Sequence, residues 1–318
     1  MRVAAVDLGT NSTRLLVADL DDGRIEPLHR ETTITRLGEG VDARRRLLPL
    51  PVARVRNCLT DYRRTIESLG ADRTLVVATS AVREAENGEA FLGEVEWSYG
   101  FATRLLSGDE EALLTFRGAT NGRALDARGT LLVDIGGGST ELVVGGSAGV
   151  ELHTSLRAGS VRHTERHLHG DPPSSEEVAA CRDAVAAALA GGAPRTAVRA
   201  AIGTAGTITS LAALDLALAA YDPERVHGHV LTAPAVEAQL ARLAALSEAA
   251  RRALPSLEPE RAPVIVVGAA ILAETLTFFG LDAIEVSERD LLDGAARAAA
   301  ELPEPEEGAA PPGAYTCC

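Results

Sequence analysis

The chain has 318 residues, 46% of them hydrophobic, and carries a formal net charge of −14 at pH 7. This length is sufficient for two domains with separate cores, whereas the acidic charge and an aromatic content of 3% argue against nucleic-acid binding. All 31 basic residues are arginine, so there is no lysine for a P-loop or for Schiff-base chemistry. The longest apolar stretch, residues 263–273, is too short to span a bilayer, and no signal-peptide pattern is visible. We therefore expect a cytoplasmic protein that binds neither membranes nor nucleic acids.

The apolar pattern of the first half predicts a β-hairpin followed by alternating helices and strands. The hairpin pairs residues 3–6 with residues 13–19. The elements that follow are a helix over 50–69, a strand over 75–78, a helix over 82–92, a strand over 102–106 and a helix over 109–116. This alternation is typical of an α/β fold.

A polar link at residues 121–129 separates the two halves, so we predict domains over 1–124 and 125–302. The second half is expected to contain strands at 130–134, 200–202, 264–267 and 284–286, and helices at 174–190, from about 208 to 220, and at 233–253. The helix at 174–190 starts with a capping-box pattern, Ser174 to Glu177. The remaining residues, 303–318, are rich in Pro, Glu and Ala and are expected to be a disordered tail.

One motif occurs twice, once in each half. The first copy reads Asp-Leu-Gly-Thr-Asn-Ser over 7–12, and the second reads Asp-Ile-Gly-Gly-Gly-Ser-Thr-Glu over 134–141. Both copies run strand, acidic residue, glycine-bearing turn, hydroxyl residues, strand. Two such copies predict an actin-like, ribonuclease H-like duplicated fold with two related domains facing each other across a cleft.

The two turns are candidate phosphate-binding loops. Glycine turns with small hydroxyl residues can aim backbone N–H groups at an anion. The candidate phosphate ligands are Gly9, Thr10, Asn11, Ser12, Gly136, Gly137, Gly138, Ser139 and Thr140. Asp7 and Asp134 end their strands at the turns, where they could hold the Mg²⁺ (or Mn²⁺) that accompanies phosphate.

Three further segments are individually weaker signals. Gly206 and Thr207 lie in a small-residue loop between an apolar strand and a helix, a favourable place for an anion. Ser80 and Arg83 follow the strand at 75–78, and an arginine there can bind phosphate through two N–H groups. The acids at 109–111 are either a solvated helix start or the source of a general base for water.

These motifs, taken in order, resemble exopolyphosphatases and guanosine pentaphosphate phosphohydrolases. The resemblance rests on the segments 7–12, 78–83, 107–112, 134–141 and 203–207, with weaker support from 286–288 and 292–294. It covers roughly residues 1–300. It implies an actin-like phosphatase that uses Mg²⁺ to cleave the terminal phosphoanhydride of a linear polyanion.

The resemblance also assigns roles to individual residues. It implies that Glu111 is the base that activates water and that Arg83 binds phosphate. Asp134 and Glu141 are similar to the family's acids at the metal and the water. A homodimer is implied by the resemblance alone.

Two features suggest a preference for short polyphosphate. The predicted ordered part ends near residue 302, without the C-terminal helical domains of longer family members, and the chain has no lysine and a charge of −14. Three alternatives remain open: a guanosine pentaphosphate 5′-phosphohydrolase, a non-catalytic sensor of polyphosphate or alarmone, and a sugar kinase or ATPase of the same fold.

Overall fold

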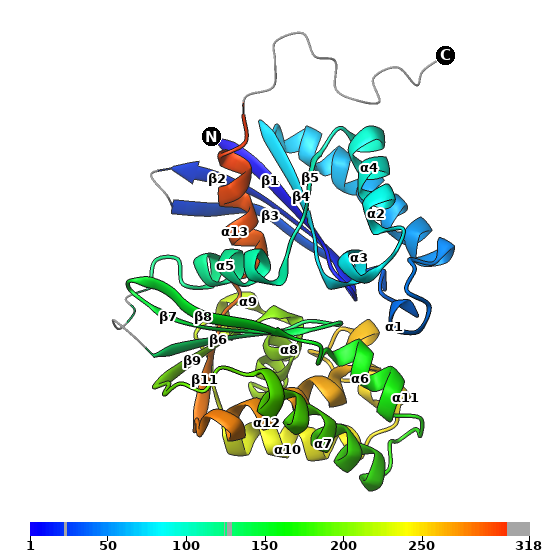
Figure 1. Cartoon of the computed structure of the whole chain (residues 1–318), viewed down its shortest axis with the longest axis vertical. Coiled ribbons are helices and arrows are strands. Elements are labelled where there is room, and N and C mark those ends of the chain that lie inside the picture. The colour runs from blue at the N-terminus through cyan, green and yellow to red at the C-terminus, as the bar shows by residue number, and fades with distance from the viewer. Residues whose placement is uncertain (22–23, 124, 126–128, 304–318) are drawn as a thin grey trace. The chain divides into compact units, whose positions relative to one another are not determined.

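The computed structural model describes residues 1–21, 24–123, 125 and 129–303. The chain divides into two compact units, which Figure 1 draws with their elements labelled. Unit 1 comprises Met1–Gly118 and the segment that begins at Leu291, and unit 2 comprises Ala119–Asp290. The division therefore falls at Gly118, somewhat before the predicted boundary at 124, and the end of the predicted second domain belongs to unit 1. Apart from Pro303, the predicted tail lies outside the described residues.

Unit 1 is built on a five-stranded sheet in the order β3-β2-β1-β4-β5. Its strands are β1 (Arg2–Leu8), β2 (Ser12–Asp21), β3 (Arg24–Ile34), β4 (Arg73–Ala78) and β5 (Ala102–Leu105). Its helices are α1 (Val41–Arg44), α2 (Pro49–Leu69), α3 (Ser80–Glu84), α4 (Gly88–Tyr99), α5 (Gly108–Ala119) and α13 (Leu291–Ala300). Strands β1, β2 and β3 pair antiparallel, whereas β4 runs parallel to β1, and β5 parallel to β4.

Both faces of the unit 1 sheet are covered by helices (Figure 1). Ala4, Val6 and Leu8 of β1 pack in one cluster with residues of α2 and α4. The intervening Val3 and Ala5 pack in a second cluster with residues of α13. Because successive side chains of a strand point to opposite faces, a strand buried on both sides is apolar throughout. The packing of α13 on β1, β2 and β4 explains why the last helix belongs to unit 1.

Unit 2 is built on a six-stranded sheet in the order β10-β11-β9-β6-β7-β8. Its strands are β6 (Thr130–Ile135), β7 (Thr140–Gly146), β8 (Gly149–Leu156), β9 (Ala200–Thr204), β10 (Val230–Thr232) and β11 (Ala283–Val286). Its helices are α6 (Ser160–His167), α7 (Ser175–Gly192), α8 (Ala205–Asp215), α9 (Pro223–Val226), α10 (Ala233–Ala244), α11 (Glu248–Arg252) and α12 (Ile265–Phe279). Helices α8 and α12 pack on β6.

The two sheets share one topology. The order β8-β7-β6-β9-β11 in unit 2 repeats β3-β2-β1-β4-β5 of unit 1, with the same parallel or antiparallel sense at every pairing. Strand β10 is an addition at the edge of the second sheet. The duplicated two-domain α/β fold of the actin-like class is therefore confirmed, and it places the two copies of the motif at equivalent positions.

Several predicted elements are confirmed. The first hairpin, α2 and β4 lie where the apolar pattern placed them. The capping box at α7 is also present. The Ser174 hydroxyl accepts a hydrogen bond from Glu177 N at 3.2 Å, and the Glu177 carboxylate accepts one from Ser174 N at 2.8 Å. In the described parts of the chain, no helix combines the length and apolar character needed to cross a membrane.

Three predicted elements are wrong. Residues 264–267 are not a strand: Val264 is the N-cap of α12, and 265–267 are its first residues. The apolar run of α12 lacks a clear period because helices of unit 2 surround it. The helix predicted over 82–92 is broken into α3 and α4, and the helix predicted over 233–253 is broken into α10 and α11, where Ser247 caps a new start. Gly88 marks the first break, since a Cβ there would lie 2.0 Å from the carbonyl oxygen of Val82.

Candidate active site

The two glycine turns have the same internal hydrogen bond. Gly9 N donates to Ser12 O at 3.0 Å between β1 and β2, and Gly136 N donates to Ser139 O at 3.0 Å between β6 and β7. A Cβ on Gly9 would lie 2.9 Å from Ser12 O, so only glycine fits that position without a shift. The repeated motif of the sequence therefore corresponds to a repeated backbone structure.

In unit 2, the first turn of α6 holds the carbonyl groups of the glycine turn. The oxygens of Gly136–Gly138 accept hydrogen bonds from Ser160 N (2.9 Å), Val161 N (2.9 Å), Arg162 N (3.1 Å) and Arg162 Nε (2.7 Å). A trans peptide points its C=O and N–H in opposite directions. The N–H groups of Gly137, Gly138 and Ser139 therefore face away from α6 as a set of three donors, an arrangement that suits an anion.

In unit 1, N–H groups of the loop after β3 hold the carbonyl groups of the turn, as α6 does in unit 2. The carbonyl of Thr10 accepts from Gly38 N at 2.8 Å, and that of Asn11 accepts from Thr35 N at 3.1 Å and Arg36 N at 2.9 Å. The same peptide geometry turns the N–H groups of Asn11 and Ser12 away from this loop. Both predicted phosphate loops thus present outward N–H groups.

The hydroxyl groups near the turns have different partners: two bond to each other, and one bonds to a backbone carbonyl. Thr10 Oγ1 and Ser80 Oγ are 2.9 Å apart and buried, so the predicted Ser80 does lie against the first turn. Thr140 Oγ1 instead donates to Ala158 O at 2.5 Å, which supports the segment before α6. Ser139 is also buried and ends the second turn. The Thr140 hydroxyl is therefore occupied by the protein, whereas the Ser139 backbone N–H faces away from α6.

The acids at the two turns have different partners. Asp7 lies opposite Arg14 in the pairing of β1 with β2, and Arg14 donates to Asp7 Oδ2 from Nε at 3.0 Å and Nη2 at 2.8 Å. Asp134 lies opposite Glu141 in the pairing of β6 with β7. Directly opposite residues share a face of the sheet, so unit 2 presents two buried carboxylates side by side.

This difference bears on which residues could hold a magnesium ion. Asp134 and Glu141 supply the carboxylate oxygens that Mg²⁺ prefers, and Ser155 Oγ orients Glu141 by donating to Oε1 at 2.8 Å. The Asp7 carboxylate is engaged by the Arg14 guanidinium instead. Among the described residues, no group of three or more His, Cys, Asp or Glu side chains is placed to hold a metal ion. A bound Mg²⁺ would therefore take its other ligands from phosphate and water.

Glu111 lies in the first turn of α5 and is buried, with 7% of its surface exposed. Arg83 of α3 donates from Nη1 to Glu111 Oε2 at 3.0 Å and to Leu106 O at 2.7 Å. The neighbouring Glu110 is different: its carboxylate accepts hydrogen bonds from Ser107 N and Oγ, both at 2.9 Å. These bonds hold the pKa of Glu110 below its usual value, the backbone bond having the larger effect. Glu110 thus caps the helix, while Glu111 is a buried, oriented carboxylate.

The third predicted loop begins α8. Thr204 is the N-cap, and Ala205 has a left-handed backbone with φ of 66°. The guanidinium of Arg261 packs on Gly206, since a Cβ there would lie 2.1 Å from Arg261 Nη1. A cation alone is electrostatically disfavoured at a helix N-terminus. An anion between the N-terminus of α8 and the Arg261 guanidinium would be attracted by both groups. Gly206 therefore leaves room for an arginine that can bind phosphate.

The sequence reasoning missed three arginines: Arg14, Arg162 and Arg261. Arg14 and Arg162 lie seven residues after Asp7 and three residues after Gly159, spacings that carry no motif of their own. Arg261 follows a Pro- and Glu-rich segment, where Glu258 Oε2 accepts from its Nε at 2.8 Å. The contact of Arg261 with Gly206 joins residues 55 positions apart and leaves no periodic signal, so only the fold reveals it.

Comparisons with known proteins identify the family of the chain. The model of the Ppx/GppA phosphatase family matches residues 16–297. The chain is 40% identical to Exopolyphosphatase 2 of Mycobacterium tuberculosis, with 93% of this chain and 97% of that protein covered. It is 30% identical to the guanosine-5′-triphosphate,3′-diphosphate pyrophosphatase of Aeromonas hydrophila, over 92% of this chain and 58% of that protein.

Two solved structures of similar fold carry related names. An exopolyphosphatase-like protein matches with a TM-score of 0.88 at 33% identity, covering 95% of this chain and 98% of the other. The Ppx/GppA family member of Aquifex aeolicus matches with a TM-score of 0.80 at 32% identity, covering 95% of this chain and 99% of the other. The chain therefore belongs to the Ppx/GppA phosphatase family.

Proposed function

We propose that this protein is an exopolyphosphatase, which hydrolyses the terminal phosphoanhydride bond of inorganic polyphosphate. The observation that carries the proposal is the outward set of N–H groups at Gly137, Gly138 and Ser139, a cradle for a phosphoryl group. The relative named Exopolyphosphatase 2, at 40% identity over nearly its whole length, supports the choice of substrate.

In this mechanism, Glu111 accepts a proton from the attacking water. The water oxygen bonds to the terminal phosphorus, the anhydride P–O bond breaks, and orthophosphate and a shortened chain leave. Phosphoryl transfer depends mainly on positioning and on stabilising negative charge. In unit 1, the N–H groups of the first turn and Arg83 are suited to supply that stabilisation, and Arg83 also orients the Glu111 carboxylate. In unit 2, the N–H groups of the second turn and Arg261 are suited to the same task.

We further propose Mg²⁺ (or Mn²⁺) as the cofactor, held by Asp134 and Glu141. When bound, the ion would neutralise the charge of the phosphate oxygens. Asp7, which was also predicted as a metal ligand, would instead hold Arg14 close to the first turn, because the two side chains form an ion pair. Ser155 would hold the Glu141 carboxylate in place.

Guanosine pentaphosphate is the second candidate substrate. The Aeromonas relative carries the corresponding name, and one aromatic ring in unit 2 suits a nucleobase. Tyr221 is 44% exposed, while its hydroxyl donates to the Glu288 carboxylate. Burial of the hydroxyl end raises the pKa of Tyr221, so the phenol stays neutral and its ring stays available for stacking.

The remaining features of the proposal concern conditions and partners. We propose a preference for short chains, because a protein with a net charge of −14 and no lysine repels a long polyanion beyond its site. We also propose a cytoplasmic homodimer that associates with neither nucleic acid nor membrane. The acidic charge supports the absence of nucleic-acid binding, and family resemblance supports the dimer.

The test is phosphate release from tripolyphosphate, long-chain polyphosphate and guanosine pentaphosphate, measured side by side with and without Mg²⁺. We expect the highest kcat/KM for tripolyphosphate. A higher kcat/KM for guanosine pentaphosphate would select the second candidate. Binding of all three without release would identify a sensor instead, and a requirement for ATP with an acceptor would identify a kinase.

A further inference from the structure

We propose that Arg162 is a positioning residue, which fixes the Gly138–Ser139 peptide so that Ser139 N–H meets the phosphoryl group. The proposal rests on the proposed function in one respect: the turn at 136–138 must be the one that binds phosphate. Arg162 itself is not assigned a contact with substrate.

The glycine turn needs an external constraint. Three consecutive glycines have no Cβ, so each samples left- and right-handed backbone conformations almost equally and loses much entropy when fixed. The absence of side chains lets a phosphate approach closely, but it also allows the peptides to flip. A flip of the Gly138–Ser139 peptide would replace an N–H donor with a carbonyl oxygen, which repels phosphate.

Arg162 supplies the constraint at the last of the three peptides. Its Nε donates to Gly138 O at 2.7 Å, whereas the carbonyls of Gly136 and Gly137 are held by backbone N–H groups of α6. Only 6% of Arg162 is exposed, and burial lowers the pKa of its guanidinium. A buried arginine is costly to keep, so its bond to this carbonyl is unlike a chance surface contact.

The start of α6 stays tied to the turn without the Arg162 side chain, because the backbone N–H groups of Ser160, Val161 and Arg162 donate to Gly136 O and Gly137 O. A Cβ on Gly159 would lie 2.3 Å from both Gly137 O and the carbonyl carbon of Gly138, so the two segments are in direct contact. Loss of the Arg162 bond therefore changes the peptide orientation at Gly138 rather than the place of α6.

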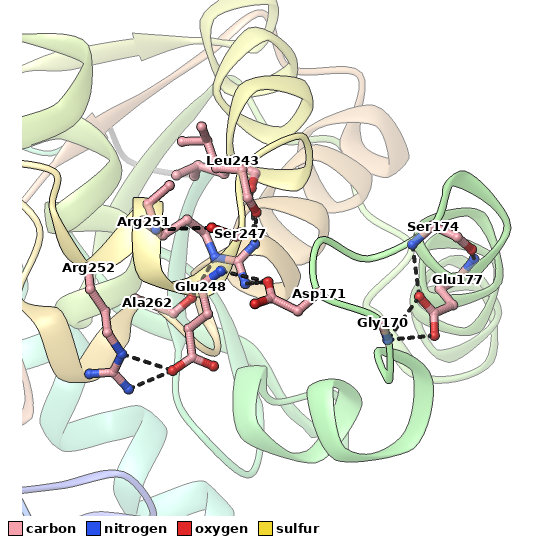
Figure 2. A network of polar contacts seen from close by, with 12 residues as sticks. Gly170, Asp171, Ser174, Glu177, Leu243, Ser247, Glu248, Arg251, Arg252 and Ala262 are labelled. Atoms are coloured by element: carbon pink, nitrogen blue, oxygen red, sulfur yellow. Dashed lines mark hydrogen bonds and ion pairs between the residues drawn. The ribbon is translucent and has the colours of Figure 1, made fainter.

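Arg251 is a matched control within the same unit. It is also buried, at 5% exposed, and its guanidinium also donates to backbone carbonyls: Ala262 O at 2.9 Å, Leu243 O at 3.1 Å and Leu246 O at 2.7 Å (Figure 2). Burial lowers the pKa of Arg251 as it does that of Arg162. Its partners belong to α10, the residues after it, and Ala262, and not to the glycine turn.

The experiment compares Arg162→Met, Arg162→Lys and Arg251→Met at a temperature where each is fully folded by circular dichroism. The first readout is the amide spectrum of protein labelled with ¹⁵N-glycine and ¹⁵N-serine, titrated with pyrophosphate. We expect the Ser139 resonance to be broadened in both Arg162 variants and to lose its pyrophosphate shift, while Arg251→Met keeps the wild-type shift.

The second readout is steady-state phosphate release from tripolyphosphate. We expect kcat/KM to fall about 10- to 100-fold in both Arg162 variants, with kcat reduced as well as KM raised, because the misplaced donor acts in the transition state. Arg251→Met is expected to stay within about twofold of wild type. A wild-type Ser139 shift and wild-type kcat/KM in folded Arg162→Lys would overturn the proposal. Wild-type protein that binds pyrophosphate at Gly137 and Gly138 without hydrolysing any substrate would overturn the proposed function instead.

Discussion

Asp134 lies directly opposite Glu141 across β6 and β7, at the register position where unit 1 pairs Asp7 with Arg14. The duplicated motif has thus kept its first acid and changed its partner. In unit 1 the pair joins opposite charges, whereas in unit 2 it places two buried carboxylates on one face of the sheet. Both turns carry outward N–H groups, but only unit 2 adds a second carboxylate at the position where unit 1 has an arginine.

The carboxylate pair predicts a change in metal affinity. Glu141→Gln keeps the shape and the bond from Ser155 but removes one charged oxygen ligand. We expect the Mg²⁺ concentration for half-maximal phosphate release to rise roughly tenfold or more. Glu151→Gln, an exposed acid on β8, is the control and should leave the Mg²⁺ dependence unchanged. An unchanged Mg²⁺ dependence in Glu141→Gln would remove Glu141 from the metal site.

The Asp7–Arg14 pair predicts an effect on stability. Both side chains are largely buried, so Arg14→Met should lower the free energy of unfolding by about 3 kcal/mol, because the Asp7 carboxylate loses its guanidinium partner. The double variant Asp7→Asn/Arg14→Met should recover a large part of that loss. Urea unfolding of wild type, both single variants and the double variant gives the coupling energy, and a coupling near zero would contradict this assignment.

His163 predicts a pH dependence of stability. Burial is the main reason that the pKa of His163 falls to about 4, so the folded protein keeps this ring neutral. Below pH 6.5 the unfolded chain binds a proton that the folded chain does not, and stability falls as the pH falls from 6.5 towards 4. Between pH 7.5 and pH 5 this histidine should lower the free energy of unfolding by about 2 kcal/mol.

The check on His163 is urea unfolding at both pH values. Over that interval the free energy of unfolding of His163→Leu should fall by about 2 kcal/mol less than that of wild type. His169→Gln, which replaces an exposed histidine of the same region, should behave like wild type. Identical pH slopes in wild type and His163→Leu would show that the ring titrates normally in the folded state.

Much of the fold could be predicted because its signals are local. The two turns, α2 and β4 follow directly from apolar periodicity and glycine placement. Residues 264–267 were misassigned because an apolar run that is buried on all sides looks the same whether it enters a helix or a strand. Strands β3 and β8 were not predicted, since their largely exposed faces leave few apolar residues to read.

The candidate site could likewise be predicted only where its signals are local in the sequence. Its turns, Glu111 and Arg83 were identified from motifs, but their pairing, Arg83 to Glu111, depends on α3 and α5 meeting in space. Arg261 could not be predicted, because its contact with Gly206 joins residues 55 positions apart with no shared pattern.

Arg261 predicts a change in substrate affinity. Arg261→Met should raise KM for tripolyphosphate about tenfold or more, because a charged hydrogen-bond donor to phosphate is removed. Arg242→Met, which replaces an exposed arginine of α10, should leave KM unchanged. Inhibition by pyrophosphate is the independent measurement, and equal inhibition constants in wild type and Arg261→Met would exclude Arg261 from the phosphate site.

We propose that Glu111 activates water, whereas its neighbour Glu110 caps α5. The most direct test measures phosphate release from tripolyphosphate by wild type, Glu111→Gln and Glu110→Gln in the presence of Mg²⁺. We expect Glu111→Gln to lower kcat by about 10²- to 10⁴-fold and Glu110→Gln to stay within about twofold of wild type, because a lost general base affects the chemical step and a lost cap affects stability. Equal kcat values for wild type and Glu111→Gln would contradict it.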